Sequence, residues 1–396
     1  MLSYEEALNE LLQATTTLGI ETVSLQDALN RTLATSISAR LDHPPFPQSA
    51  MDGFAISAPT DAMNFSIQGA AYAGDHLPPP LDAGQAYKVA TGGPIPFNSF
   101  AVVPIEDADV EGPSLSISSR PTKGRWIRQR GMDVKQGESL IAAHTKLSAG
   151  CLSNLAQQGI QEVETFKTPT IGILTTGDEV CRIDVPRPNH QIFNSNQTLL
   201  KALLQQTEAR IGQCLHAPDS AQTIEKSLKE LSKNHDLILT TGGASVGERD
   251  HLVDVLRDSG DLNFWKVKMR PGKPVFAGRI ENTPVLGLPG NPVSTFASFH
   301  LFARPVIGTI TGVETPQLRW TWVPSPIDVR PHPQRRDFLR ACWKSRLTTS
   351  ELPYILASGQ TSGHGRDLLA TDLLIEIPSI DERQIEPGEL VRAFFL

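Results

Sequence analysis

The chain has 396 residues, of which 39% are hydrophobic, and a formal net charge of −7 at pH 7. This length exceeds what one hydrophobic core usually supports, so we expect about two to four domains. The acidic balance argues against nucleic acid and anionic membranes as partners, because both select basic surfaces.

The cysteines and the first residues predict a cytoplasmic protein. The four cysteines lie far apart without a CxxC pair, which favours reduced thiols over disulfides or a zinc site. Met1 precedes an acidic, amphipathic stretch rather than a signal sequence, and no apolar run approaches the ~20 residues of a membrane span. We therefore expect neither secretion nor membrane insertion.

The first 168 residues alternate between helical and β patterns. Ser3 and Glu6 form a capping box before leucines at helical spacing, and a second short helix is predicted from Ser24. Residues 43–140 are rich in Pro, Gly and short apolar runs, which predicts a β domain. A helix returns at 148–159, so we interpret the β domain as an insertion in a discontinuous helical domain, 1–42 and 141–168.

Residues 169–315 predict a parallel sheet covered by helices. Strands expected at 170–176, 211–216 and 236–241 alternate with amphipathic helices, the pattern of βαβ units. Further strands are expected at 262–269 and 284–289. Residues 316–396 contain short apolar runs between Pro, Gly and charged turns, which predicts a C-terminal β domain.

Three polar or glycine-rich loops follow predicted strands at one edge of this sheet. They are residues 176–179, 241–250 and 288–294. Because such loops present free backbone NH groups at the carboxyl ends of strands, we expect them to cradle phosphates. Acidic residues in two of the loops could hold Mg²⁺ or could cap helices instead; they are Asp178, Glu179, Glu248 and Asp250.

A basic segment follows in this acidic chain. If 262–269 is a strand, its alternation places Lys266, Lys268 and Arg270 on one face, and Pro271-Gly272 then turn Lys273 toward the same edge. An anionic ligand would compensate these charges. The alternative is a solvated basic edge that discourages strand pairing.

The sequence from Gly243 to Gly247 also matches GxSxG, the nucleophile elbow of serine hydrolases, with Ser245 as the nucleophile. A triad needs a histidine on a suitable loop, and His300 falls within a predicted helix. The glycine pair and the acidic residues beside it suit phosphate and Mg²⁺ better than acyl transfer.

Eight motifs together resemble the molybdopterin molybdenumtransferases, a family that includes the gephyrin E domain. They are SAMDGFA (49–55), VATGGPIP (89–96), TTGDEV (175–180), NSN (194–196), TTGGASVGERD (240–250), RPGKP (270–274), LPGNPVS (288–294) and RRDFLR (335–340). The resemblance spans essentially the whole chain. It implies a multidomain α/β plus β fold: the discontinuous helical domain, the inserted β domain (43–140), a central parallel α/β molybdopterin-binding domain (169–315) and a C-terminal β barrel (316–396).

The resemblance also implies an activity and partners. The expected reaction inserts molybdenum from molybdate into adenylylated molybdopterin, releases AMP and requires Mg²⁺. The expected assembly is a homodimer, with transient docking to a molybdopterin adenylyltransferase and to recipient molybdoenzymes. No nucleic acid or membrane is expected as a partner.

Finally, the resemblance implies a set of site residues. Catalytic roles are expected for Asp52, Glu179, Asp250, Lys266, Arg270 and Lys273, with Glu179 and Asp250 holding Mg²⁺. Substrate binding is expected for Thr91, Arg128, Asp133, Asp219, Gly242, Gly243, Ser245, Pro289, Gly290, Pro292, Arg335 and Arg340. A non-catalytic scaffold that kept the fold is the main alternative, and the hydrolase is the second.

Overall fold

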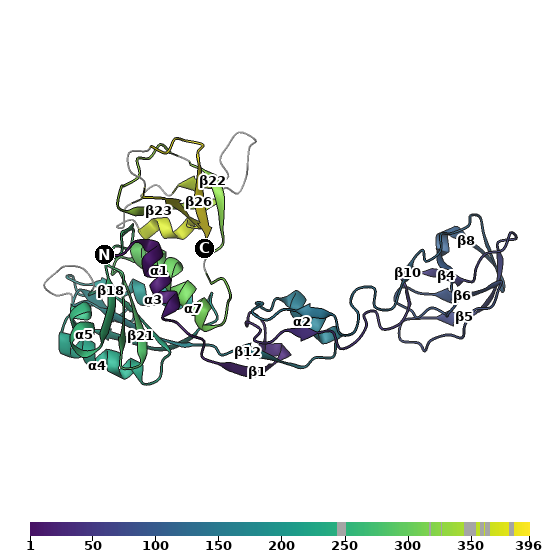
Figure 1. The fold of residues 1–396 in the computed structure, drawn as a ribbon, viewed down its shortest axis with the longest axis horizontal. Helices are drawn as coiled ribbons and strands as arrows, with labels where there is room; N and C mark the ends of the chain where they lie inside the picture. Colours follow the sequence, from purple (N-terminus) through teal and green to yellow (C-terminus); the bar gives the residue numbers. More distant parts are fainter. Residues whose placement is uncertain are drawn as a thin grey trace. The chain divides into compact units, whose positions relative to one another are not determined.

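The computed structural model describes residues 1–243, 251–316, 318–325, 327–343, 354–356, 360, 365–379 and 384–396. The chain folds as a mixed α/β protein with two compact units (Figure 1). The first unit comprises Met1–Val23, Asn30–Ala34 and Glu164–Leu396, and the second comprises Ser24–Leu29 and Thr35–Val163. The boundaries of the four predicted domains stay a prediction.

A six-stranded sheet, here called the α/β sheet, is the centre of the first unit, in the order β16-β13-β17-β21-β20-β18. Its four parallel strands are β16 (Arg210–Ala217), β13 (Thr170–Thr176), β17 (Leu237–Thr241) and β21 (Thr283–Leu288). Strand β20 (Phe276–Ile280) is antiparallel to β21 and to its other neighbour, β18 (Asp261–Trp265), so the sheet is mixed rather than purely parallel as expected. Strands β14 (Val180–Cys181) and β15 (Ile192–Phe193) form a separate parallel pair.

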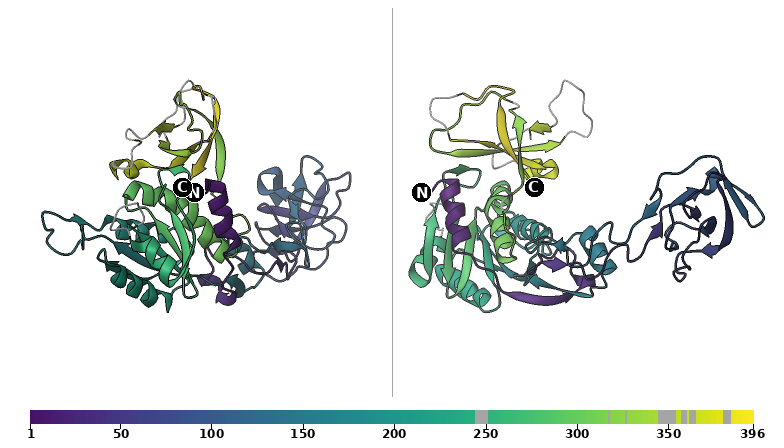
Figure 2. Two further views of the ribbon diagram at one scale, coloured as in Figure 1. Left: turned by 60° about the vertical axis from the view of Figure 1, so that its left-hand side comes forward. Right: turned by 45° about the vertical axis from the view of Figure 1, so that its right-hand side comes forward.

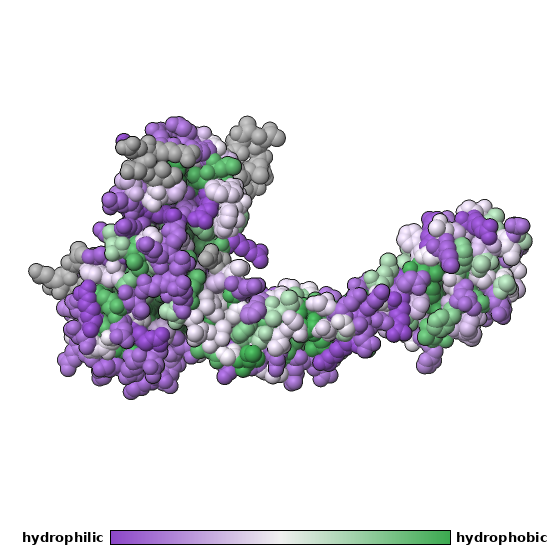
Figure 3. Space-filling view, in the orientation of Figure 1, coloured by the Kyte–Doolittle hydropathy of each residue, from purple (hydrophilic) through white to green (hydrophobic). Residues whose placement is uncertain are grey.

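Helices cover both faces of the α/β sheet because its central strands are apolar on both sides (Figures 1 and 2). One face packs against α1 (Tyr4–Gln13), α3 (Ser195–Leu204) and the continuous helical segment α6 (Pro292–Ser298), η3 (Phe299–Ala303) and α7 (Arg304–Ile310). The opposite face packs against α4 (Ala221–Ser232) and α5 (His251–Ser259). The outer surface around α4 and α5 is mostly hydrophilic (Figure 3), as expected for amphipathic helices.

The predicted uninterrupted strand over 262–269 is wrong. Strand β18 ends at Trp265, and Lys266 adopts a φ of 72°, a left-handed conformation that takes the chain out of the sheet. The chain then forms β19 (Met269–Arg270), which pairs in parallel with β23 (Arg336–Trp343) of the last part of the chain. The basic segment therefore connects two sheets.

These last residues form the C-terminal sheet, in the order β19-β23-β25-β26-β22, with β24 (Tyr354–Leu356) paired to β23. Its other strands are β22 (Trp320–Pro324), β25 (Leu373–Ile377) and β26 (Leu390–Phe395), and the short helix η4 spans Gly365–Ala370. Among the described residues the end strands β19 and β22 do not pair with each other. A closed barrel therefore stays a prediction.

The second unit contains the predicted inserted β structure, as a six-stranded sheet in the order β7-β4-β6-β5-β9-β8. Its strands are β4 (Gly53–Ile56), β5 (Asn64–Ala71), β6 (Gln85–Val89), β7 (Ala101–Pro104), β8 (Ala108–Glu111) and β9 (Ser114–Ile117). Short pairs join β2 (Ile37–Ser38) to β11 (Ser139–Ile141), and β3 (Gln48–Ser49) to β10 (Ile127–Arg128). The helix η2 spans Ile105–Asp107.

The predicted helices of the first 168 residues have different outcomes. Helix α1 begins after Ser3 with the predicted capping box, and α2 (Ala149–Gln157) begins after Ser148. The second predicted helix, from Ser24, is only the short turn η1 (Leu25–Asp27), which follows β1 (Ile20–Ser24). Strand β1 pairs with β12 (Glu162–Phe166), and the residues after Ser24 also bond the chain around β12. The Leu25 amide donates to the Gln161 carbonyl and the Ala34 amide to the Glu164 carbonyl, so extended pairing replaced a weak helical pattern.

No helix in the described parts of the chain is both long enough and apolar enough to cross a membrane. The structure describes all four cysteines and joins none of them in a disulfide.

Candidate functional site

The carboxyl ends of four parallel strands meet at one edge of the α/β sheet. Thr176 lies opposite Ala217, and Thr241 lies between Thr175 and Leu288 in the strand register. The loops that follow β13, β16, β17 and β21 therefore leave the sheet side by side, where ligands of open parallel sheets bind. We call this the carboxyl edge.

Glycines allow three of these loops to touch. Gly242 has a φ of 90°, and a Cβ atom there would lie 2.7 Å from the Thr176 Oγ1. A Cβ atom at Gly290 would lie 3.3 Å from the Gly242 Cα. The same Cβ at Gly242 would lie 2.8 Å from the Thr176 carbonyl oxygen, so the end of β13 and the loops after β17 and β21 approach one another closely at these glycines. We call the loops after β13, β17 and β21 the glycine loops.

The acidic residues of the carboxyl edge differ in what they bind. The Asp178 amide donates to the Asp219 carboxylate (3.3 Å), and the Asp219 amide donates to the Asp178 carboxylate (3.1 Å). This reciprocal pair closes the loops after β13 and β16. The exposed Glu179 carboxylate folds over the Gly177 Cα and accepts no hydrogen bond from the described residues.

Several predicted site residues lie outside the described residues. They are Ser245, Glu248 and Asp250, which follow β17 in the sequence. Gly243, the last described residue before them, has a φ of 58°. Among the described residues there is no group of three or more His, Cys, Asp or Glu side chains that could hold a metal ion.

The loop after β21 is held by polar contacts that the sequence did not reveal. Pro289 is buried, Asn291 caps α6, and Pro292 occupies the first turn of that helix. The Asn196 amide of α3 donates to the Gly290 carbonyl (2.6 Å), and the Thr295 hydroxyl donates to the Pro289 carbonyl (2.6 Å). Asn196 belongs to the NSN segment, so the motif was visible although its contact was not.

The basic segment returns to the carboxyl edge. Trp265 pairs with Phe276, which pairs with Gly287 near the end of β21, so residues 266–275 leave the sheet beside the glycine loops. The Lys266 Nζ lies 3.6 Å from the centre of the Trp265 ring, and Lys273 is exposed. The predicted common strand face of Lys266 and Lys268 does not form, because neither residue lies in a strand. The Lys268 amide instead donates to the Leu2 carbonyl ahead of α1.

The two arginines of the C-terminal sheet that were predicted to bind substrate lie in different environments. The Arg335 Nε donates to Asp337 (2.9 Å), and the same carboxylate accepts from the Arg270 Nη2 (2.6 Å). The Arg340 side chain is completely buried and lies 3.5 Å from Asp367. Burial lowers the pKa of Arg340. An exposed anion-binding role fits Arg335 and Arg270, whereas the burial of Arg340 indicates a structural role.

In the second unit, loops near β3 gather four predicted residues. Strand β3 pairs with β10 on one side, and Ser49 bonds the backbone of Gly92 and Gly93 on the other. The Thr91 amide and hydroxyl both donate to the Asp52 Oδ1 (2.7 and 2.8 Å), which holds the pKa of this carboxyl below its usual value.

Among the four predicted residues of this unit, Arg128 and Asp133 also form an ion pair, at 2.5 Å. His43 lies 3.9 Å from the same carboxylate. Strand β10 carries Arg128 and β3 leads directly to Asp52, so the four predicted residues lie on adjoining segments of one unit.

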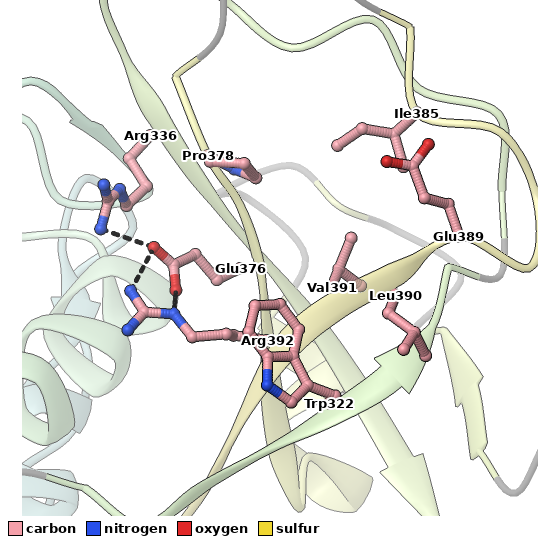
Figure 4. Close-up of a pocket in the computed structure, with 9 residues that line it drawn as sticks. All are labelled: Trp322, Arg336, Glu376, Pro378, Ile385, Glu389, Leu390, Val391 and Arg392. Atoms are coloured by element: carbon pink, nitrogen blue, oxygen red, sulfur yellow. Dashed lines mark hydrogen bonds and ion pairs between the residues drawn. The ribbon is translucent and has the colours of Figure 1, made fainter.

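A cavity of about 510 Å³ lies in the C-terminal sheet, away from the glycine loops (Figure 4). Trp322, Leu390 and Val391 contribute apolar walls, and at one end Glu376 binds the guanidinium groups of Arg336 and Arg392. No predicted site residue lines this cavity. The converging loops and charges of the carboxyl edge are therefore the better candidate for the reaction.

Comparisons with known proteins match both units. Residues 2–159 match the model of the MoeA N-terminal region (domain I and II), and residues 172–309 match the model of a probable molybdopterin binding domain. A molybdopterin molybdenumtransferase of Haemophilus influenzae is 33% identical over 79% of this chain and 78% of its own length. One from Synechococcus elongatus is 32% identical over 96% of this chain and 100% of its own length.

A solved structure of a related protein has the same fold over the whole chain. The molybdopterin biosynthesis MoeA protein of Pyrococcus horikoshii OT3 superimposes with a TM-score of 0.84 at 26% identity, covering 100% of both chains.

Proposed function

Because the chain belongs to the molybdopterin molybdenumtransferase family, we propose that it inserts molybdenum from molybdate into adenylylated molybdopterin and releases AMP. The observation that carries this proposal is the contact of the three glycine loops at the carboxyl edge, beside Lys266 and Lys273. Free backbone NH groups and cations at one place suit a pyrophosphate and an oxyanion.

The proposal includes Mg²⁺. Glu179 presents a carboxylate at this edge that accepts no hydrogen bond from the described residues, and hard cations take such oxygens as ligands. Glu179 and Asp250 would hold the ion, with the remaining positions left to water and phosphate oxygens. When bound, Mg²⁺ neutralises charge on the phosphate oxygens.

The protein residues would act by position and charge. Lys266, Arg270 and Lys273 attract and orient the pyrophosphate and molybdate, while the loop from Pro289 to Pro292 offers a rigid backbone to the anion. The reaction breaks one P–O bond of the pyrophosphate, with an oxygen of water or molybdate as the attacking atom. The two dithiolene sulfurs bind molybdenum, and their protons leave with one molybdate oxygen as water. No protein nucleophile is needed, so catalysis is electrostatic stabilisation of the transition state.

The hydrolase alternative has little support. Ser245 lies outside the described residues, and His300 is buried in the helical segment after α6, with neither ring nitrogen bonded to a described group. The cytoplasmic location, the homodimer and the docking with an adenylyltransferase or recipient molybdoenzymes belong to the same proposal. They rest on the family, and sedimentation of the purified chain would test the homodimer.

The test is AMP release from adenylylated molybdopterin with Mg²⁺, measured with and without molybdate. We expect release that depends on molybdate, with molybdenum retained on the pterin, and loss of at least about 100-fold in Glu179→Ala and Asp250→Ala. Glu225→Ala is the matched control, because this half-buried carboxylate binds Lys229 and Ser259 on the helices that cover the sheet and belongs to none of the loops of the carboxyl edge. A wild type that binds the pterin yet releases no AMP would support the scaffold alternative.

A further inference from the structure

One carboxylate joins two cations of the proposed site. Asp337 lies on β23 with its side chain only 10% exposed, and its two oxygens bind different arginines. Arg270 comes from β19 at the end of the basic segment, and Arg335 comes from the residues just before β23. Because β19 and β23 pair in parallel with Arg270 opposite Asp337, the backbone also fixes this contact.

The geometry leaves most donors of both arginines available. Arg270 uses Nη2 and Arg335 uses Nε for Asp337, and no other described side chain accepts from either guanidinium group. Their side chains remain 56% and 32% exposed, so their other edges face solvent. Two guanidinium groups against one carboxylate leave one net positive charge in this cluster.

We propose that Asp337 is a positioning residue that holds the guanidinium groups of Arg270 and Arg335 at a fixed spacing to receive an oxyanion of the substrate. This proposal rests on the proposed function, since it concerns the affinity of the same site for its anions. The planar fork of arginine binds tetrahedral oxyanions well only when its orientation is fixed beforehand, and one buried carboxylate fixes two forks here. The oxyanion could be free molybdate or a phosphate of the nucleotide.

The C-terminal sheet provides a matched control on its other face. Glu376 on β25 is 3% exposed and binds Arg392 through two hydrogen bonds (2.6 and 2.9 Å) and Arg336 at 2.5 Å (Figure 4). It lies opposite Phe338, the neighbour of Asp337, so strand alternation puts the two carboxylates on opposite faces. Both bridge two arginines, but only Asp337 binds an arginine of the basic segment.

The sign of the effect separates positioning from charge balance. Asp337→Asn removes one negative charge. If Asp337 only balanced charge, the variant would therefore bind oxyanions more tightly than the wild type. A positioning carboxylate predicts the opposite, because both guanidinium groups lose their anchor. We expect affinity to fall about tenfold, the usual scale for removing a group that orients a ligand-binding side chain.

The experiment titrates inorganic molybdate, and separately inorganic pyrophosphate, into the full chain by calorimetry. We expect Asp337→Asn to weaken at least one oxyanion about tenfold and Glu376→Gln to leave both within about twofold. A loss for molybdate alone identifies the free oxyanion as the ligand, and a loss for pyrophosphate identifies a phosphate group. During turnover, the KM for the affected ligand should rise more than kcat falls.

Three results would overturn the proposal: equal or tighter oxyanion binding in Asp337→Asn, equal losses in Asp337→Asn and Glu376→Gln, or no oxyanion binding by the wild type. Because the titrations need no AMP release, an inactive wild type would contradict the proposed function and leave the effect of Asp337 measurable.

Discussion

At the scale of single residues, hydrogen bonds from Thr91 favour the ionised form of the exposed Asp52 carboxyl. Both donors of Thr91 bind one oxygen of Asp52, and these bonds lower the pKa of the carboxyl. The contact is therefore present above the usual carboxyl pKa and is lost as the pH falls through the lowered one. The Asp-Gly sequence alone would be read as an ordinary turn.

We predict that Thr91→Val raises the pKa of Asp52 toward its ordinary value of 3.8, because the variant keeps the amide donor and removes the hydroxyl donor. The measurement is the carboxyl carbon chemical shift of Asp52 in an NMR pH titration. Thr91→Ser keeps the hydroxyl and should keep the low pKa. Equal titration of all three proteins would show that the hydroxyl bond does not form in solution.

His300 is the second residue whose environment sets its charge. It lies in η3 with its ring edge-on to Phe296 (4.7 Å) and Phe299 (5.7 Å), and neither ring nitrogen has a described hydrogen-bond partner. Burial, helped by Arg304, lowers the pKa of His300 from 6.5 to about 3. The folded protein therefore keeps a neutral imidazole at a pH where the unfolded chain takes up a proton.

This difference predicts acid sensitivity with a definite sign. Stability should fall as the pH drops below 6.5, by about 2 kcal/mol at pH 5 from this residue alone, because only the unfolded state gains the proton. His300→Phe fits the surrounding rings and should show that much less loss between pH 7 and pH 5 in denaturant unfolding. A variant with the same pH dependence as the wild type would exclude His300 as the source.

At the scale of elements, the close contact of the glycine loops makes a sharp prediction. Gly242 and Gly388 have nearly the same φ, 90° and 89°, so an alanine at either costs about 1–2 kcal/mol of backbone strain. A Cβ at Gly388 meets nothing within 4 Å, whereas at Gly242 it lies 2.8 Å from the Thr176 carbonyl oxygen. Only Gly242→Ala must therefore displace the loop.

We expect both glycine variants to lose a similar amount of stability from strain, and only Gly242→Ala to lose further stability and most AMP release. Thermal unfolding and the AMP assay on the same preparations would measure this. If Gly388→Ala were as inactive as Gly242→Ala, strain or general destabilisation rather than loop contact would explain the loss.

The same elements show what the sequence could predict. Most strands and helices between Pro169 and Ile310 follow from long apolar runs and helical periodicity, signals that lie within one segment, but β20 was not predicted. The break at Lys266 was missed because a left-handed lysine has no local signature, and the chain leaves the sheet there to pair with distant residues. The helix expected from Ser24 did not form because the backbone of Leu25 and Ala34 bonds to Gln161 and Glu164, which are distant in the sequence.

The candidate site divides in the same way. Glycines, prolines and charges at the ends of predicted strands mark the carboxyl edge, because strand order alone brings such loops together. Asn196 and Asp337 could not be assigned roles in this way, since each acts on a residue that is distant in the sequence. Contacts of this kind depend on how finished elements pack.

At the scale of the molecule, the first unit holds two sheets together through α1. Tyr4 is buried between Phe302 of η3 (5.5 Å) and Phe338 of β23 (5.3 Å), so it contacts both the helical cover of the α/β sheet and the C-terminal sheet. Burial raises the pKa of the Tyr4 hydroxyl, which stays neutral. Arg336 reinforces the join by binding Glu5.

We predict that Tyr4→Ala loosens this join and, with it, the arginine pair. Removing the buried ring should cost about 3 kcal/mol of unfolding free energy. Because Arg270 and Asp337 lie on β19 and β23, which span the same join, oxyanion affinity should fall along with stability. Tyr4→Phe keeps the ring and should preserve both properties.

If Tyr4→Ala lost stability but bound molybdate and pyrophosphate like the wild type, the β19 to β23 pairing alone would suffice to hold the arginines. The helix at the start of the chain would then serve only the stability of the fold.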